Sequence, residues 1–249
     1  MSRLVLLGVP IDALTFQEAL ARFRMFLTDE KQHHIATPNP EMLIEAQRNP
    51  LFHRVLQETS LNLADGTGLL WASRLKGHPL PERVTGTDMM KALCMEKDLP
   101  PVFLLGAAFG IAEKVGEILR GQNPSLVIAG TWSGFPDEEQ EGDIVHRINA
   151  SGAHILFVAF GAPKQELWIH RNLTKLPSVH LAMGVGGAFD FIAGKQKRAP
   201  VWMQSLGLEW LYRLMKEPRR VKRIWNAVVV FPILVMKRTN IKESKNQTI

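Results

Sequence analysis

The sequence predicts an α/β fold: a doubly wound, mostly parallel sheet followed by a helical, basic C-terminal appendage. Short runs rich in Val, Ile, Leu and Phe recur before Gly194, and a turn and an amphipathic helical pattern generally follow them. Several runs are apolar at successive positions, which is typical of strands covered on both faces. After Gly194 the strand runs stop, and helical segments rich in Lys and Arg begin. We therefore expect an α/β body at 1–195, which is large enough to be a catalytic domain, and a helical appendage at 196–249.

Seven runs are strand candidates, and we expect them to form the sheet. They are residues 3–9, 33–37, 59–65, 101–107, 125–131, 154–161 and 179–187. No internal repeat or low-complexity segment interrupts this series.

Helical patterns stand between these runs, and several begin with a recognisable cap. Thr15 and Glu18 form a capping box, Asn39 precedes Pro40 as an N-cap, and Thr87 with Asp88 is expected to cap the next helix. Further amphipathic patterns cover residues 110–121, 138–152 and 163–173. Two helical segments, divided near Pro218, follow in the appendage.

The charge is unevenly distributed. The chain has a net charge of +6, but residues 195–249 contain 13 Lys and Arg against 3 Asp and Glu, so the appendage is at +10 and the rest at −4. Such asymmetry indicates an anionic partner, either a nucleic acid or a membrane surface. The apolar run at 224–236 is shorter than the roughly 20 residues of a spanning helix. Asn226 and Pro232 interrupt it, which favours lying on a membrane over crossing it.

Several features that the sequence lacks exclude classes of protein. Cys94 is the one cysteine, which excludes an internal disulfide framework and fits a reducing compartment. The N-terminal apolar run is too short for a signal peptide, so we expect a cytoplasmic protein. There is no P-loop, no H-E-x-x-H and no D-x-D pair, and therefore no predicted metal or cofactor.

Polar residues and glycines near the carboxyl ends of the predicted strands are the candidates for a ligand site, because ligands of parallel α/β sheets bind there. The candidates are Thr37, Asn39, Asp65, Gly106, Phe135, Gln165, Glu166 and Asp190. Asp65 suits either a helix cap or a general base, and the residues alone leave both open. Arg83 is either a solvated surface residue or a bidentate ligand of phosphate.

Taken together, the motifs resemble those of the WecG/TagA/CpsF glycosyltransferase family. They are IATPNPEM, LADGTGLLWASRL, ERVTGTDMM, FLLGA, FVAFGAPKQELWI, GVGGAFDFIAGKQKRAP and GLEWLYRLMKEPRR, in this order. The resemblance covers nearly the whole chain. It implies a Rossmann-like fold without a metal, and transfer with inversion of an N-acetylmannosamine-type sugar from its UDP derivative. The implied acceptor is polyprenyl-diphosphate-linked N-acetylglucosamine at the cytoplasmic face of the membrane.

The resemblance also implies roles for individual residues. Asp65 would be the general base, and Thr37, Asn39 and Gln165 would line the sugar pocket. The appendage would close over the diphosphate with Arg213, Arg220 and Arg223. From their predicted places near strand ends, we further expect Phe135 and Asp190 to contact the nucleotide, with Gly106 in a phosphate-approaching turn.

Two other functions stay open at this stage. A Rossmann-type oxidoreductase is disfavoured because the G-x-G-x-x-G motif is missing. A nucleic-acid-binding appendage is disfavoured by the run Val-Val-Val-Phe-Pro-Ile-Leu-Val, since surfaces that bind nucleic acids are charged and wet. The donor sugar and the oligomeric state, including a homo-oligomer, are not determined by the sequence.

Overall fold

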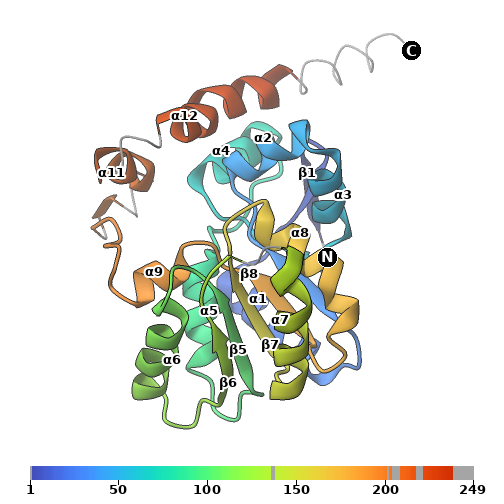
Figure 1. Cartoon of the computed structure of the whole chain (residues 1–249). Coiled ribbons are helices and arrows are strands. Elements are labelled where there is room, and N and C mark those ends of the chain that lie inside the picture. The colour runs from blue at the N-terminus through green and yellow to red at the C-terminus, as the bar shows by residue number, and fades with distance from the viewer. Residues whose placement is uncertain (1, 136–137, 201, 204–207, 217–220, 238–249) are drawn as a thin grey trace.

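The computed structural model describes residues 2–135, 138–200, 202–203, 208–216 and 221–237. Its centre is a six-stranded sheet of order β4-β3-β8-β7-β5-β6, in which each described pair of neighbours is parallel. The strands are β3 (His33–Ala36), β4 (Leu61–Asn62), β5 (Val102–Gly106), β6 (Ile128–Trp132), β7 (Ile155–Ala159) and β8 (Leu181–Gly184). Six of the seven predicted runs contribute to it, which confirms the predicted fold class (Figure 1).

The first predicted run, residues 3–9, does not join this sheet. It forms an antiparallel hairpin of β1 (Arg3–Leu6) and β2 (Val9–Asp12). Leu7 and Gly8 have φ values of 50° and 86°, as in the tight turns that suit hairpins. The prediction of a parallel strand was wrong here because an apolar run by itself does not show where the chain reverses.

Helices cover both faces of the sheet, as in a doubly wound fold. One hydrophobic cluster lies under α1 (Phe16–Thr28), α5 (Gly86–Cys94), α6 (Ile111–Gln122) and α9 (Ala188–Ile192). A second lies on the other face, under α7 (Glu138–Ser151) and α8 (Lys164–Asn172). The strands between them, β3, β5, β7 and β8, are buried at every position. This explains why their sequences are apolar without alternation.

The predicted helix caps are mostly confirmed. The Thr15–Glu18 capping box starts α1. The cap of α5 was wrongly predicted: Thr85 occupies it, with its Oγ1 3.1 Å from the backbone nitrogen of Asp88. Thr87 lies within the helix instead. The helix begins earlier than expected because its first residue is Gly86, which the sequence pattern does not mark as helical.

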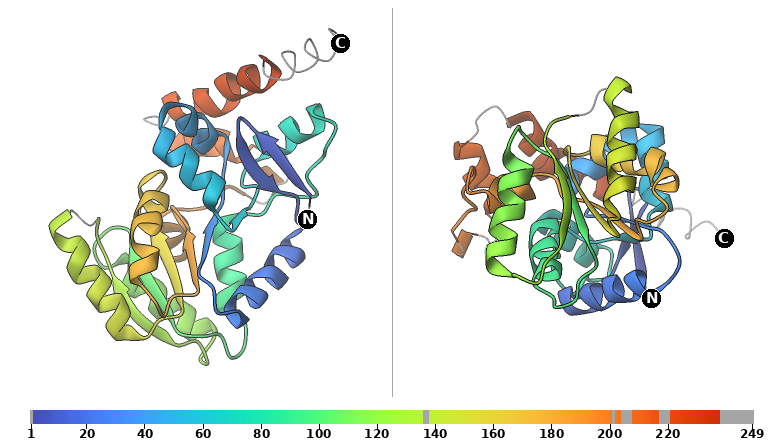
Figure 2. Two further views of the ribbon diagram at one scale, coloured as in Figure 1. Left: turned by 90° about the vertical axis from the view of Figure 1, so that its right-hand side faces the viewer. Right: turned by 60° about the horizontal axis from the view of Figure 1, so that its bottom comes forward.

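A third hydrophobic cluster forms a lobe at one end of the sheet. It joins the β1–β2 hairpin to α2 (Pro40–Arg48), α3 (Pro50–Glu58) and α4 (Thr67–Leu75). The C-terminal helices lie across this lobe (Figures 1 and 2). They are α11 (Glu209–Lys216), α12 (Val221–Trp225), the π-helical turn η3 (Asn226–Val230) and the helical residues 231–237. Within the described ranges, no helix has the length and apolar character needed to span a bilayer.

The appendage contributes to the core of this lobe. Phe231 and Val235 are 0% and 1% exposed and belong to the same cluster as Leu43 and Leu69. Gly68 permits the close packing: a Cβ there would stand 2.7 Å from Cγ of Pro40 and 3.8 Å from the Phe231 ring. The start of α4, the start of α2 and the appendage therefore meet at one point.

We expect Phe231→Ala to lower the free energy of unfolding by about 3–5 kcal/mol, the usual effect of removing a buried aromatic ring. Ile233→Ala is the matched control, because Ile233 is 43% exposed on the same helical segment. Urea unfolding followed by tryptophan fluorescence measures both. Equal, small losses would contradict the packing of the appendage into the lobe.

Candidate active site

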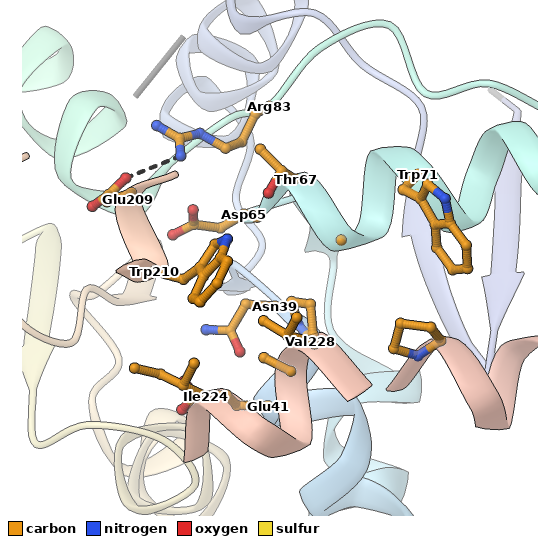
Figure 3. A pocket seen from close by; sticks show the side chains of 15 residues that line it. Asn39, Glu41, Asp65, Thr67, Trp71, Arg83, Glu209, Trp210, Ile224 and Val228 are labelled. Carbon is orange, nitrogen blue, oxygen red and sulfur yellow. Dashed lines mark hydrogen bonds and ion pairs between the residues drawn. The ribbon is translucent and has the colours of Figure 1, made fainter. Parts of the chain in front are cut away.

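A cavity of about 590 Å³ lies between the lobe and the C-terminal helices (Figure 3). The loops after β3 and β4, the first turns of α2 and α4, and the C-terminal helices form its walls. The lining residues are Asn39, Pro40, Glu41, Asp65, Gly66, Thr67, Gly68, Trp71, Arg83, Glu209, Trp210, Ile224, Ala227, Val228 and Pro232. Three of the predicted site residues are among them: Asn39, Asp65 and Arg83.

The pairing of β3 with β4 brings Asp65 and Asn39 together. The parallel pairing continues past the strands, because the backbone nitrogen of Asp65 donates to the carbonyl of Pro38 at 2.9 Å. Gly66, at φ 133°, then turns the chain against Pro40, so that a Cβ would lie 3.1 Å from the proline ring. Gly66 is also the N-cap residue of α4. Asp65 is therefore not the N-cap residue of this helix, and its role as a general base stays a prediction.

Asn39 combines two tasks. Its Oδ1 accepts a hydrogen bond from the backbone nitrogen of Met42 at 3.0 Å, and it thereby caps α2 as the sequence predicted. Its side-chain amide nitrogen has no hydrogen-bond partner among the described residues. Because the residue lines the cavity, this N–H₂ group is a hydrogen-bond donor in the cavity wall, and sugar binding by Asn39 stays a prediction.

Arg83 connects the body to the appendage. Its guanidinium donates to the Glu209 carboxylate at 3.0 Å, and the two side chains are 18% and 13% exposed. Arg83 is thus not a solvated surface residue. It presents a cation at the same end of the cavity as Asp65 (Figure 3).

A second cation, Arg198, lies close to this end. It forms two hydrogen bonds with the carboxylate of Asp88. These bonds raise the pKa of Arg198, and the charges of Asp88, Glu209 and Asp65 add to the effect against the opposing effect of burial. Although burial favours the protonated form of Asp88, hydrogen bonds from Arg198 and Thr85 hold its pKa below the usual value. The sequence did not single out Arg198, because nothing in a basic segment distinguishes the arginine that is paired.

The three arginines expected in the appendage differ in what the structure describes. Arg223 donates to Glu41 at 2.7 Å, which places its guanidinium beside a cavity-lining residue. Arg213 lies in α11, but its side chain is outside the described part of the structure, and Arg220 lies outside the described residues altogether.

Gln165 is buried and connects two loops at the carboxyl ends of β7 and β8. Its Oε1 accepts from the backbone nitrogens of Gly161 and Gly186, each at 3.0 Å. Its Nε2 donates to Oε1 of Glu166 at 2.7 Å. Gln165 therefore does not line the cavity, and neither does Thr37, which is 7% exposed and packs beneath Gly86.

Gly106, Phe135 and Asp190 lie near the ends of other strands and also outside the cavity lining. Gly106, at φ 110°, leaves no room for a Cβ, which would stand 2.8 Å from the Phe160 ring. Phe135 is 58% exposed, and its ring centroid is 6.2 Å from that of Phe160. Oδ1 of Asp190 is buried with no hydrogen-bond partner among the described residues. A role in nucleotide binding stays a prediction for all three.

Several lining residues were missed by sequence reasoning: Glu41, Thr67, Trp71, Glu209 and Trp210. Glu41, Thr67 and Trp71 lie within motifs that the sequence analysis quoted. The helical period would have shown the shared face of Thr67 and Trp71, four residues apart. Glu209 and Trp210 lie in the GLEWLYRLMKEPRR motif, but only the tertiary structure shows which of its residues turn towards the body.

The described residues contain no group of three or more His, Cys, Asp or Glu side chains that could hold a metal ion. Metal independence is implied by the family resemblance and stays a prediction.

The comparisons with known proteins decide the family. The family model described as the glycosyl transferase WecG/TagA/CpsF family matches residues 4–245. The chain belongs to this glycosyltransferase family. It is also similar to the N-acetylglucosaminyldiphosphoundecaprenol N-acetyl-beta-D-mannosaminyltransferase of Bacillus spizizenii. The two are 36% identical over 201 residues, which cover 80% of this chain and 77% of the relative.

Membership of the WecG/TagA/CpsF family confirms the resemblance seen in the motifs and makes the protein a glycosyltransferase. The oxidoreductase alternative is thereby set aside. The match extends through α11, α12 and residues 231–237. The C-terminal helices and the residues of the cavity therefore lie within the part of the chain that matches the family model.

Glu166 makes the stability of the folded protein depend on pH. Burial raises the pKa of its carboxyl from 4.5 to about 7, although hydrogen bonds from Gln165 and its own backbone N–H oppose the rise. The folded state thus favours the neutral acid. This contribution to stability is fully present below pH 4.5 and is lost as the pH rises through about 7.

We expect Glu166→Gln to remove this loss, because the amide is neutral at every pH and keeps an oxygen for Gln165. Relative to wild type, the variant should gain on the order of 3 kcal/mol of unfolding free energy between pH 5 and pH 8. Chemical denaturation at both pH values measures the gain. Glu117→Gln, an exposed position on α6, is the control. An identical pH dependence in all three proteins would contradict burial of a neutral Glu166.

Proposed function

We propose that this protein transfers an N-acetylmannosamine-type sugar, with inversion, from its UDP derivative to polyprenyl-diphosphate-linked N-acetylglucosamine. The product would enter the synthesis of a cell-surface polysaccharide. The name of the Bacillus spizizenii relative supports this proposal. It specifies an N-acetylglucosaminyldiphosphoundecaprenol and the transfer of an N-acetylmannosaminyl group. The observation on which the proposal rests is that Asp65, Asn39 and Arg83 line one cavity closed by the C-terminal helices.

Asp65 is proposed as the general base. Its carboxylate would accept the proton of the acceptor hydroxyl as that oxygen forms a bond to the anomeric carbon of the donor. The bond between this carbon and the phosphate oxygen breaks on the opposite face, and UDP leaves with the electron pair. A single displacement of this kind inverts the anomeric centre. Asn39 would hold the sugar through its side-chain N–H₂ group, fixed beforehand by the capping bond to Met42.

The diphosphate of the acceptor requires positive charge. Arg83 supplies a guanidinium in the cavity wall. The N-cap residue of α4 is Gly66, which has no side chain to cap the helix, so the first N–H groups of α4 would face an anion. Arg223, and with it Arg213 and Arg220, would add to this charge from the appendage. Thr37, Gln165, Gly106, Phe135 and Asp190 are proposed for the donor, on the carboxyl ends of the neighbouring strands.

The appendage is also proposed as a peripheral membrane anchor on the cytoplasmic face. Large apolar side chains are exposed along it: Trp202, Met215, Val221, Trp225, Ile233 and Met236. Lys222, Arg223 and Lys237 are exposed among them. Apolar side chains can enter the headgroup boundary, while each cation gains about 1 kcal/mol near an anionic leaflet. This favours a membrane over a nucleic acid, and a homo-oligomer stays open.

Asp65→Asn should fold and still bind UDP but lose about 10²–10⁴-fold in turnover, because it removes a positioned base. The assay is UDP release from UDP-N-acetylmannosamine with a lipid-linked N-acetylglucosaminyl diphosphate. Asp143→Asn, a carboxylate exposed on α7, is the matched control. Turnover near that of the wild type across the pH range would refute the assignment of the base.

Wild-type protein should float with anionic liposomes at low salt and less at high salt, because the attraction is partly electrostatic. Trp225→Glu should abolish most flotation, since Trp225 is 60% exposed on the appendage. Phe109→Glu changes a side chain that is 96% exposed on the body, before α6, and should leave flotation intact. Equal flotation of the two variants would contradict the anchoring role.

A further inference from the structure

The two ends of the cavity differ in chemistry. Asp65, Arg83 and Glu209 bring charge to one end, as Figure 3 shows. Trp71 lies at the right of that view, away from these three residues. After α11, the C-terminal helices contribute four apolar residues to the cavity wall: Ile224, Ala227, Val228 and Pro232. A ligand that fits the whole cavity must therefore be charged at one end and apolar at the other.

The apolar end is built from two elements that face each other. Trp71 lies on α4, one helical turn after Thr67, and Val228 lies on the turn η3 that packs against α2. Both side chains are 39% exposed although they line a cavity. Large apolar side chains that face a cavity leave apolar area that a ligand can bury, and this burial favours binding. Phe231, just before Pro232, holds this wall in place from the core.

We infer that the apolar end binds the isoprene units nearest the diphosphate of the acceptor lipid, with Trp71 as the principal contact. The inference rests on the proposed function and deepens it. If the acceptor sugar lies at Asp65 and its diphosphate near Arg83, the chain bonded to that diphosphate must continue through the cavity. The carboxylates of Glu41, Asp65 and Glu209 line the rest of the wall and do not favour a hydrocarbon.

The size of the cavity limits how much of the lipid it holds. A volume of about 590 Å³ is that of a cavity for a ligand of drug size, within the usual range of roughly 300–1,000 Å³. A sugar, a diphosphate and the first isoprene units fill such a space. The remainder of a long polyprenyl chain stays in the bilayer, beside the exposed apolar side chains Trp225 and Ile233 of the same helical segment.

The test uses the full-length protein in solution with two water-soluble acceptors, N-acetylglucosaminyl diphosphate esterified either to a three-isoprene chain or to a methyl group. Wild type should show a KM for the prenyl acceptor at least about 10-fold lower, equal to about 1.4 kcal/mol of binding. Trp71→Ala should raise the prenyl KM about 10-fold relative to the methyl KM. Ala227→Phe, which fills the apolar end, should do the same.

Leu75→Ala is the matched control, because Leu75 is 48% exposed one turn further along α4 and does not line the cavity. It should match wild type with both acceptors. Equal KM values for the two acceptors in wild type would overturn the inference while turnover itself would support the proposed function. An equal rise of the prenyl and methyl KM values in both cavity variants would overturn it as well, since Trp71 and Ala227 would then act on the headgroup. Turnover of neither acceptor would overturn both proposals.

Discussion

The burial of Phe231 is the contact on which the arrangement of the site depends. Its ring lies fully buried among Leu43 and Leu69, at the point where Gly68 lets α4 approach α2. Residues 224–232, which form the apolar wall of the cavity, are placed by this contact. The catalytic body and the appendage that we expected from the sequence therefore share one hydrophobic cluster. A hydrophobic core that includes both segments stabilises the wall of the cavity together with the lobe.

The parallel sheet separates the two halves of the proposed reaction. Asn39 and Asp65 follow β3 and β4, at one edge of the sheet, and line the cavity where an acceptor would lie. Gly106 ends β5, towards the other edge, and Asp190 follows β8, in the middle. Gln165 connects the loops after β7 and β8 and so stands in the middle of the sheet, among the second group. A donor and an acceptor bound at these places would approach each other along the carboxyl edge of the sheet.

The sequence was most informative where a local rule decides the structure. Successive apolar residues predicted the buried strands, and the Asn39–Pro40 pair predicted the cap of α2, because strands and caps depend on neighbouring residues. It was least informative where segments distant in sequence meet. Arg83 with Glu209, and Asp88 with Arg198, join residues more than 100 positions apart, and no local pattern marks such pairs. The hairpin at residues 3–12 was missed because its strands are too short to distinguish from one longer apolar run.

Among the described residues, two of the ion pairs that join the body to the C-terminal helices have opposite polarity. In one, the body supplies the cation, Arg83, and α11 supplies the anion, Glu209. In the other, the body supplies the anion, Glu41, and α12 supplies the cation, Arg223. Sliding or reversing the appendage would bring Arg223 towards Arg83 and Glu209 towards Glu41, and both juxtapositions are repulsive. The more exposed Arg223–Glu41 pair on its own adds little to stability. Together with the Arg83–Glu209 pair, however, it favours a single placement of the C-terminal helices on the body.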